Sequence, residues 1–470
     1  MLFNSFEFVF VFLPVVIILF FGTAKIFGRT SAKLFLITAS IFFYGYWNIK
    51  FIPLILISLL VNYFTAREIQ NAKDANKKYF LIAGITFNIL LLGYFKYAKF
   101  FVSMAGIIIP DIILPLGISF FTFSQTAFLI NNFNGSIKNF SLLNYSEFVL
   151  FFPYVTSGPI TDFRDVNTQF DDNENFTPDY DSIAVGLNLF IIGLFKKTVI
   201  ADGLAQIVMK VFASTDTLTF FEAWIGALGY SFQLYFDFSG YSDMAIALAL
   251  MLNIELPENF NAPYKSTSII EFWRRWHITL GAWIREYIYI PLGGNRHGEF
   301  NKLRNLFIAM LFTGLWHGAG WTFILWGALH GVMLIVNNLW RKLKITLPKF
   351  LSWLLTFMSV VISWMIFRAE SVDEAFKIIS AMFDFNKFIL PVKFGKYFKF
   401  LEHFGFSFDD IHLFVKPCIL YVLLVLVTGI LYKNMSKIKY SYKFIFMILI
   451  WALWSFCNFS EITDFLYFKF

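Results

Sequence analysis

The sequence has few charged residues and almost no cysteine. Only 15% of its 470 residues are charged and 58% are hydrophobic, whereas a soluble domain has about 25% charged residues and about 45–50% apolar ones. The mean hydropathy is +0.66. This composition excludes an ordinary soluble globular protein and predicts an integral membrane protein. The two cysteines, Cys418 and Cys457, lie in apolar runs and indicate neither a disulfide framework nor a metal site.

Several signals of common enzyme and binding classes are absent as well. The sequence has no Gly-rich phosphate-binding motif, no metal-ligand spacing and no nucleophile elbow, so we expect no metal. We find no internal repeat, which disfavours a secondary transporter, because many transporters are built from repeats. The net charge of +7 does not indicate nucleic acid, because cytoplasmic loops of membrane proteins are rich in Lys and Arg.

What the chain does have is a series of long apolar stretches. A membrane-spanning helix needs about 20 mainly apolar residues, and fewer when it is packed inside the protein. The sequence therefore predicts an all-α, polytopic integral membrane protein with roughly 11 or 12 transmembrane helices. Residues 114–134 are apolar but interrupted by Pro115 and Gly117, which predicts a re-entrant segment covered by protein. The candidate spans are residues 6–21, 34–47, 51–64, 79–95, 100–109, 183–195, 220–252, 306–316, 321–338, 350–367, 417–431 and 444–459.

Short basic loops define an expected orientation in the membrane. Lys and Arg accumulate in loops on the cytoplasmic side. Crossing the first and the last predicted span from these loops places both termini outside the cytoplasm, together with the longer segment 368–416. The basic loops are residues 25–33, 67–78, 301–305, 341–349 and 433–443.

An aromatic and basic stretch, residues 269–291, is the first candidate for a functional site. If it is helical, Arg274, His277, Gly281 and Arg285 recur at spacings of three and four and share one face. Its tryptophans and tyrosines suit a helix at the membrane interface. One interpretation is an interfacial helix whose arginines contact lipid phosphates. The other is a cytoplasm-facing basic rim that receives a phosphate-bearing donor.

His317 is the second candidate. It follows the uncharged apolar run 306–316, and an ionisable side chain at membrane depth is costly and therefore a functional candidate. Gly314, Gly318 and Gly320 allow a close backbone approach or a helix break beside it. A neutral histidine there can take the proton from an acceptor hydroxyl as it attacks a carbonyl. The alternative is a buried neutral imidazole bonded to a neighbouring helix.

Two carboxylates, Asp237 and Asp243, interrupt the apolar span 220–252. Buried carboxylates need partners, so these residues predict a polar track between helices. The alternative is a structural ion pair with an arginine of the basic stretch. His297 and His330 have no comparable setting, and we interpret them as a loop residue and a helix-end residue.

Six segments of the chain together resemble the membrane-bound O-acyltransferase (MBOAT) family. The similarity is to its bacterial branch, which acts in alginate O-acetylation, peptidoglycan O-acetylation and teichoic-acid D-alanylation, and it is greatest to the peptidoglycan O-acetylation members. The segments are PLGISFFTF (115–123), FFPYVTSGPI (151–160), YFDFSGYSDMAIALA (235–249), ENFNAPY (258–264), FWRRWHITLGAWIREYIYIPLGGNR (272–296) and GLWHGAGWTFILWGALHG (314–331).

The resemblance implies a single membrane-embedded acyltransferase domain, residues 1–470, with a catalytic core at 114–331 and a central tunnel. His317, in the WHG motif, is then the catalytic histidine, and His277, in the RWH motif, is the second one. An acyl thioester, expected to be acetyl-CoA, enters from the cytoplasm. The expected donor-binding residues are Arg274, Arg275 and Arg285.

The C-terminal segment 444–470 combines the last predicted span with an aromatic tail, FLYFKF. The tail is similar to a tyrosine-containing motif of some systems in this branch, which implies that Tyr467 carries the acyl group between donor and final acceptor. A phenol has a pKa of about 10, far below an aliphatic alcohol, so its ester stays reactive toward onward transfer. The alternative is that the tail only anchors the chain at the membrane interface.

Taken together, the resemblance implies a multi-pass O-acetyltransferase of the bacterial cytoplasmic (inner) membrane. It would pass acetyl toward hydroxyls of an extracytoplasmic glycan, with peptidoglycan as the first choice, through a separate esterase-like O-acetyltransferase in the periplasm. Membrane lipid is a further expected partner. The alternatives are alginate or another exopolysaccharide as acceptor, a D-alanyl group on a carrier protein as donor, and, in a different class, a glycan flippase or transporter.

Overall fold

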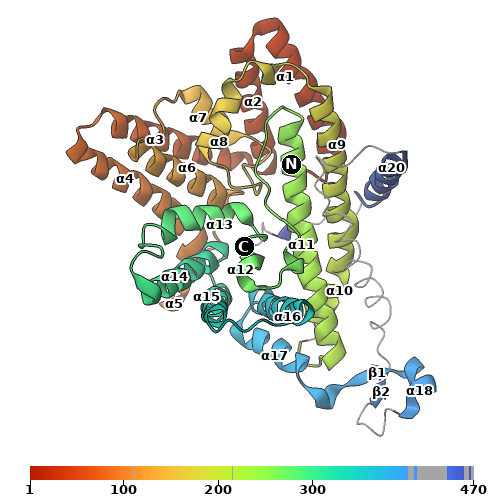
Figure 1. The fold of residues 1–470 in the computed structure, drawn as a ribbon. Helices are drawn as coiled ribbons and strands as arrows, with labels where there is room; N and C mark the ends of the chain where they lie inside the picture. The colour runs from red at the N-terminus through yellow and green to blue at the C-terminus, as the bar shows by residue number, and fades with distance from the viewer. Residues whose placement is uncertain (108, 214, 401–406, 410–441, 460–464, 467–470) are drawn as a thin grey trace. The chain divides into compact units, whose positions relative to one another are not determined.

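The computed structural model of the chain is built almost entirely of helices (Figure 1). It describes residues 1–107, 109–213, 215–400, 407–409, 442–459 and 465–466. Two three-residue strands, β1 (Ile389–Pro391) and β2 (Ser407–Asp409), pair in parallel. The predicted all-α class is confirmed.

The chain divides into two compact units. The first contains Met1–Phe195, Ser239–Asn259 and Lys439–Lys469, and the second contains Lys196–Phe238, Phe260–Ile438 and Phe470. The predicted catalytic core, 114–331, therefore contributes residues to both units. The long helix α11 (Phe220–Leu250) also has residues in both.

The first unit holds the N-terminal helices and the last described helix. Its elements are η1 (Phe8–Phe12), α1 (Leu13–Phe27), α2 (Arg29–Trp47), η2 (Ile49–Phe51), α3 (Ile52–Asn71), α4 (Asp74–Leu92), η3 (Gly93–Tyr97), α5 (Ala98–Met104), α6 (Ile118–Phe133), α7 (Leu142–Leu150), α8 (Phe163–Asp171), η4 (Glu174–Phe176), α9 (Tyr180–Phe195) and α20 (Tyr442–Cys457).

The second unit holds the segments that the sequence singled out for chemistry. Its elements, besides the strands and the first part of α11, are η5 (Lys196–Ala201), α10 (Asp202–Phe212), η6 (Pro263–Lys265), α12 (Ile269–Trp273), α13 (Ile278–Ile284), η7 (Arg285–Tyr289), α14 (Gly298–His317), α15 (Trp321–Lys342), α16 (Lys349–Arg368), α17 (Val372–Met382), η8 (Phe385–Lys387) and α18 (Val392–Phe398).

Six helical stretches among the described residues are long and apolar enough to cross a membrane, where the sequence predicted roughly 11 or 12 spans. The predicted span 79–95 and the first part of the predicted span 100–109 lie in one continuous helical stretch that ends at Met104, because no break separates α4, η3 and α5. The predicted span 417–431 lies outside the described residues. The six stretches are Phe8–Phe27, Ile49–Asn71, Asn76–Met104, Tyr180–Phe212, Trp321–Lys342 and Lys349–Arg368.

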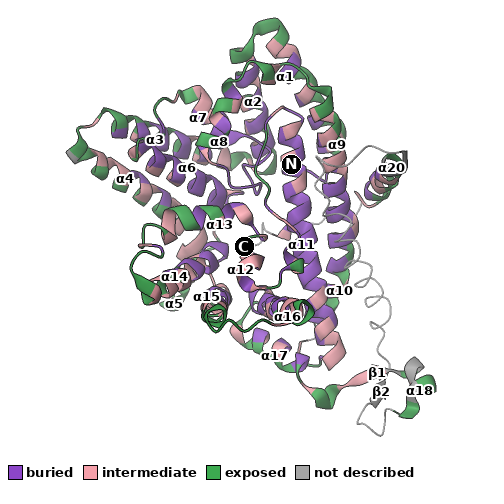
Figure 2. Ribbon diagram, in the orientation of Figure 1, coloured by how far each residue is buried: buried purple, intermediate pink, exposed green. Residues whose placement is uncertain are grey.

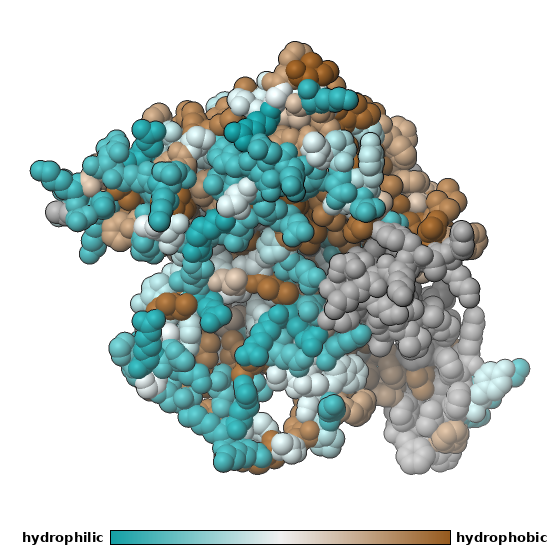
Figure 3. Space-filling model, turned by 45° about the horizontal axis from the view of Figure 1, so that its top comes forward, coloured by the Kyte–Doolittle hydropathy of each residue, from teal (hydrophilic) through white to brown (hydrophobic). Residues whose placement is uncertain are grey.

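The surface of these helices is apolar. Ile18, Leu90 and Phe350 are 68%, 66% and 69% exposed, and Figure 3 shows hydrophobic patches on the face in view. By contrast, α11 is buried along most of its length (Figure 2). Side chains of this kind are stable in contact with lipid and costly in contact with water, so the chain is a multi-pass membrane protein.

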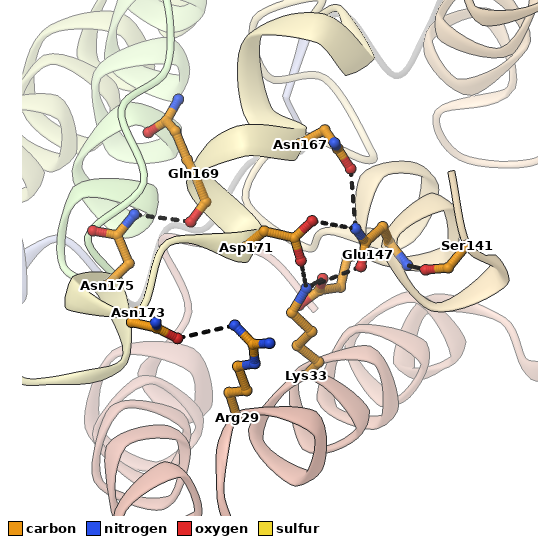
Figure 4. A network of polar contacts seen from close by, with 10 residues as sticks. Arg29, Lys33, Ser141, Glu147, Asn167, Gln169, Asp171, Asn173 and Asn175 are labelled. Carbon is orange, nitrogen blue, oxygen red and sulfur yellow. Dashed lines mark hydrogen bonds and ion pairs between the residues drawn. The ribbon is translucent and has the colours of Figure 1, made fainter. Parts of the chain in front are cut away.

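An ion-pair network centred on a buried lysine joins three helices of the first unit (Figure 4). The ammonium of Lys33, on α2, lies 3.3 Å from Glu147 on α7 and 2.7 Å from Asp171 on α8. Asn144 donates to the second carboxylate oxygen of Asp171 at 2.7 Å. Lys33 and Glu147 are both buried, so the network compensates charges that would otherwise be costly.

Candidate active site

Two glycines set the distance between α14 and α15. A Cβ added to Gly314 would lie 2.3 Å from the carbonyl oxygen of Phe323, and one added to Gly327 would lie 2.5 Å from that of Met310. A side chain at either position would push the helices apart. The close backbone approach that the sequence predicted at Gly314 is confirmed, three residues before the end of α14.

His317 is the last residue of α14 and lies among aromatic rings. Its side chain is buried, and its ring centroid is 5.2 Å from that of Trp326 and 5.3 Å from that of Phe367. The next residue, Gly318, is extended and ends the helix. The predicted span 306–316 is thus the second half of a helix that begins at Gly298, and His317 stands at its C-terminal end.

The prediction that residues 269–291 form one helix with a shared face is wrong. α12 ends at Trp273, and α13 begins only at Ile278. Between them His277 has φ +45° and ψ +54°, a left-handed conformation that a non-glycine residue adopts only where the surroundings hold it. The backbone N–H of Asn261 donates to the carbonyl of Arg275 at 2.9 Å, and this bond stabilises the break.

The break brings His277 beside His317. The side chain of His277 is completely buried, and its ring centroid is 6.4 Å from that of His317. The ring of Phe238 packs on it at 4.7 Å, edge to face. His277 lies outside the six spanning stretches, and burial lowers the pKa of its imidazole to about 3. It is therefore a neutral imidazole at physiological pH.

A cleft of about 600 Å³, which we call the basic cleft, is lined by residues close in sequence to the two histidines but not by the histidines themselves. Thr313 lines it one helical turn before His317, and Leu280 lines it three residues after His277. Arg274 and Arg285 line it as well, and neither forms an ion pair with any described residue. The remaining lining residues are Ile270, Trp273, Ile278, Gly281, Ile284, Tyr289, Lys302, Leu306, Ala309, Met310, Leu334, Asn338 and Arg341.

Arg275 does not line the basic cleft, although the sequence grouped it with Arg274 and Arg285. Its guanidinium pairs with Glu271 at 2.8 Å and donates to the carbonyl oxygen of Asn261 at 3.1 Å. The backbone N–H of Asn261 also donates to the carbonyl of Arg275, so bonds in both directions join this residue to Asn261 beside the break. We therefore interpret Arg275 as a residue that holds the chain break in place.

The two carboxylates of α11 belong to different units. Asp237 is buried in the second unit and pairs with Lys197 at 2.7 Å, and Lys197 also pairs with Asp202 at 2.8 Å. Asp237 thus forms a structural ion pair, but the predicted pairing with an arginine of the basic stretch is wrong, because the partner is a lysine of η5. Asp243 is half-buried in the first unit.

Sequence reasoning missed His330. It lies inside α15 and is fully buried, not at a helix end, whereas His297 is an exposed turn residue as predicted. His330 follows Trp326 by four residues and so shares a helix face with it, a spacing that could have pointed to a packed position. The predicted relay, Tyr467, lies outside the described residues.

The chain has clear relatives. The model of "MBOAT, membrane-bound O-acyltransferase family" matches residues 41–372. The peptidoglycan O-acetyltransferase of Helicobacter pylori is 44% identical over 82% of this chain and 80% of its own length. The probable alginate O-acetylase AlgI of Azotobacter vinelandii is 43% identical over 83% of this chain and 79% of its own length.

A more distant relative has another acyl group in its name. The teichoic acid D-alanyltransferase of Streptococcus thermophilus is 32% identical over 50% of this chain and 59% of its own length. The family match covers both histidines, the basic cleft and the six segments from which the resemblance was drawn. The chain therefore belongs to the membrane-bound O-acyltransferase family, and it is a multi-pass membrane O-acyltransferase.

Proposed function

We propose that this chain is an O-acetyltransferase of the bacterial inner membrane that takes acetyl from cytoplasmic acetyl-CoA and passes it toward an extracytoplasmic glycan. The observation that carries the proposal is the pair of buried histidines, His277 and His317, together with a cleft lined by Arg274 and Arg285, which form no ion pair within the described part of the chain. Peptidoglycan is the first choice of acceptor, which the 44% identity to the Helicobacter pylori enzyme supports.

The basic cleft has the chemistry that a coenzyme A thioester requires. Guanidinium groups bind phosphates through paired N–H donors, and those of Arg274 and Arg285 have no described carboxylate to compete for them. The apolar lining, which includes Leu306 and Met310, suits the uncharged pantetheine arm. Acetyl-CoA would enter by its thioester end, toward Thr313 and His317.

His317 would act as a general base and then as a general acid. Its neutral imidazole takes the proton from an acceptor hydroxyl while that oxygen attacks the thioester carbonyl carbon. The tetrahedral intermediate then collapses, the carbon–sulfur bond breaks, and the imidazolium returns the proton to the leaving thiolate. The products are an O-acetyl ester and free coenzyme A. His277, 6.4 Å away ring to ring, would position or polarise the thioester carbonyl.

The proposed first acceptor of the acetyl group belongs to the C-terminal tail. The orientation expected from the basic loops places both termini outside the cytoplasm, so the phenol of Tyr467 is proposed as the first acceptor. A separate esterase-like transferase in the periplasm would then move the acetyl group to the glycan. A central tunnel through the membrane would connect the donor and acceptor sides.

Transfer from isotopically labelled acetyl-CoA tests the proposal in the purified protein. His317→Ala should lower the rate by about 10²–10⁴-fold, because general-base catalysis contributes on this scale. His297→Ala, the same change at an exposed turn residue, is the matched control and should leave the rate unchanged. A His317→Ala variant as fast as wild type would refute the assignment.

Mass mapping of the C-terminal peptide, with Tyr467→Phe alongside, decides whether the phenol carries the label.

Two relatives support an alternative acceptor and an alternative donor. Alginate or another exopolysaccharide is the second choice of acceptor, which the 43% identity to the Azotobacter vinelandii protein supports. A D-alanyl group on the phosphopantetheine arm of a carrier protein is the second choice of donor, which the match to the Streptococcus thermophilus protein supports. The same assay with a D-alanyl carrier protein in place of acetyl-CoA separates the two donors.

A further inference from the structure

His330 lies between the basic cleft and His317. Its ring centroid is 5.3 Å from that of Trp273 and 4.7 Å from that of Trp326. Trp273 lines the basic cleft, and Trp326 packs edge to face on His317 at 5.2 Å. The two indoles also contact each other at 5.8 Å. His330 is therefore in contact with both side chains that connect the cleft to the proposed catalytic histidine.

The hydrogen bonds of His330 fix the position of its single ring proton. The indole N–H of Trp273 can only donate, and it donates to Nδ1 of His330 at 3.2 Å. Nδ1 must therefore be the unprotonated nitrogen, and Nε2 carries the proton. Nε2 lies 3.0 Å from the hydroxyl of Ser363, which in turn donates to the carbonyl of Val360 at 2.7 Å. Every donor in this series has an acceptor.

This series joins three helices of the second unit: α12 through Trp273, α15 through His330, and α16 through Ser363. Both His330 and Ser363 are 0% exposed. A second proton on the ring would bury a charge and set an N–H donor against the indole N–H. The imidazole therefore acts as a rigid linker with one acceptor end and one donor end.

We propose that His330 is a positioning residue of the acyltransferase, which through its Nδ1 acceptor holds Trp273 against the donor and through its ring holds Trp326 against His317. The proposal rests on the proposed function, because it assigns the Nδ1 acceptor of His330 to donor binding and the packing of its ring on Trp326 to the catalytic step. The hydrogen bond from Trp273 to Nδ1 should therefore affect the KM for acetyl-CoA. The packing of the ring on Trp326 should affect kcat.

Two conservative substitutions separate these roles. The side-chain oxygen of Asn occupies about the place of Nδ1, and the side-chain nitrogen of Gln reaches about the place of Nε2. His330→Asn thus keeps the acceptor for Trp273 and loses the bond to Ser363, whereas His330→Gln keeps the bond to Ser363 and loses the acceptor. Both variants lack the ring that packs on Trp326.

Steady-state kinetics of the purified full chain with acetyl-CoA test the assignment. His330→Gln should raise KM by roughly three- to tenfold, the effect of one buried hydrogen bond, whereas His330→Asn should stay within about twofold of wild type. Both should lower kcat. Trp273→Phe, which removes the donor and keeps the histidine, should raise KM like His330→Gln, and the double variant should add no further increase.

The outcomes are distinguishable. Equal KM values for His330→Asn and His330→Gln, or variants that only lower the yield of folded protein, would overturn the proposal in favour of a purely structural residue. If wild type transfers no acetyl group, the proposed function fails, and ¹⁵N NMR of ring-labelled histidine still tests the linker. An Nε2–H signal that disappears in His330→Asn supports it, and an Nδ1–H or doubly protonated ring overturns it.

Discussion

At the scale of single residues, His277 shows how backbone and side chain are fixed together. It occupies a left-handed conformation, which costs a non-glycine residue about 1–2 kcal/mol, and it is completely buried beside Phe238 and His317. Packing of the ring compensates the backbone strain. The same burial keeps the ring neutral, so its protonation must be unfavourable in the folded state.

This burial predicts a pH dependence of stability. The pKa of His277 is about 3 in the folded state, and that of an unfolded histidine is about 6.5. The unfolded state therefore binds the proton first, and stability is lost as the pH falls below 6.5. Between pH 7.5 and 5.5, His277 should lower the free energy of unfolding by about 1.3 kcal/mol.

The comparison of wild type with His277→Asn measures this contribution. Thermal unfolding in mild detergent should show a larger loss of Tm between pH 7.5 and 5.5 in wild type than in the variant, because only wild type has the buried imidazole. Identical pH dependence of the two proteins would show that His277 is not held neutral by burial.

At the scale of elements, the contact between α14 and α15 depends on the absence of side chains. Gly314→Leu should lower the stability by about 1–3 kcal/mol, the usual cost of overpacking, and should move His317, which lies three residues further along α14. We therefore expect a lower Tm and a loss of acetyl transfer. Gly320→Ala is the control, because a Cβ there meets its nearest neighbour at an ordinary 3.4 Å. Full activity of Gly314→Leu would contradict the role of this contact.

The ion pair between the buried residues Lys33 and Glu147 gives a second prediction at the scale of elements. Lys33→Met removes the cation shared by Glu147 and Asp171, and it should destabilise the protein by about 3–5 kcal/mol, because a carboxylate is left buried without its partner. Lys77→Met breaks an exposed pair with Asp74 and should cost less than about 1 kcal/mol. Thermal unfolding of the two variants side by side measures the two losses of stability. Equal losses of Tm would contradict the role of burial.

At the scale of the whole molecule, the orientation in the membrane decides which side supplies the donor. α16 (Lys349–Arg368) is one of the spanning stretches, so its exposed first residue and an exposed residue just after its last one should lie on opposite sides of the membrane. In a protein with Cys418 and Cys457 replaced by Ser, Lys349→Cys should react with an impermeant thiol reagent only after the membrane is opened. Glu370→Cys should react in intact cells. The reverse pattern would invert the orientation, and labelling of both from one side would show that α16 does not span.

The sequence by itself determined the membrane class, the helical fold and the family. Hydropathy is a sum over neighbouring residues, so a stretch such as Trp321–Lys342 can be recognised without knowing what packs on it. The motifs around His277 and His317 likewise identified two residues that the fold brings together, 6.4 Å apart ring to ring.

Only the tertiary structure decided which neighbours of these histidines share their site. The sequence predicted that Arg274, Arg275 and Arg285 bind the donor together, but Arg275 pairs with Glu271 and donates to the backbone of Asn261, and of the three arginines Arg274 and Arg285 line the basic cleft. The partner of Asp237 and the role of His330 likewise come from residues distant in sequence. Trp273 and His330 are 57 positions apart, and no local pattern encodes a hydrogen bond over that separation.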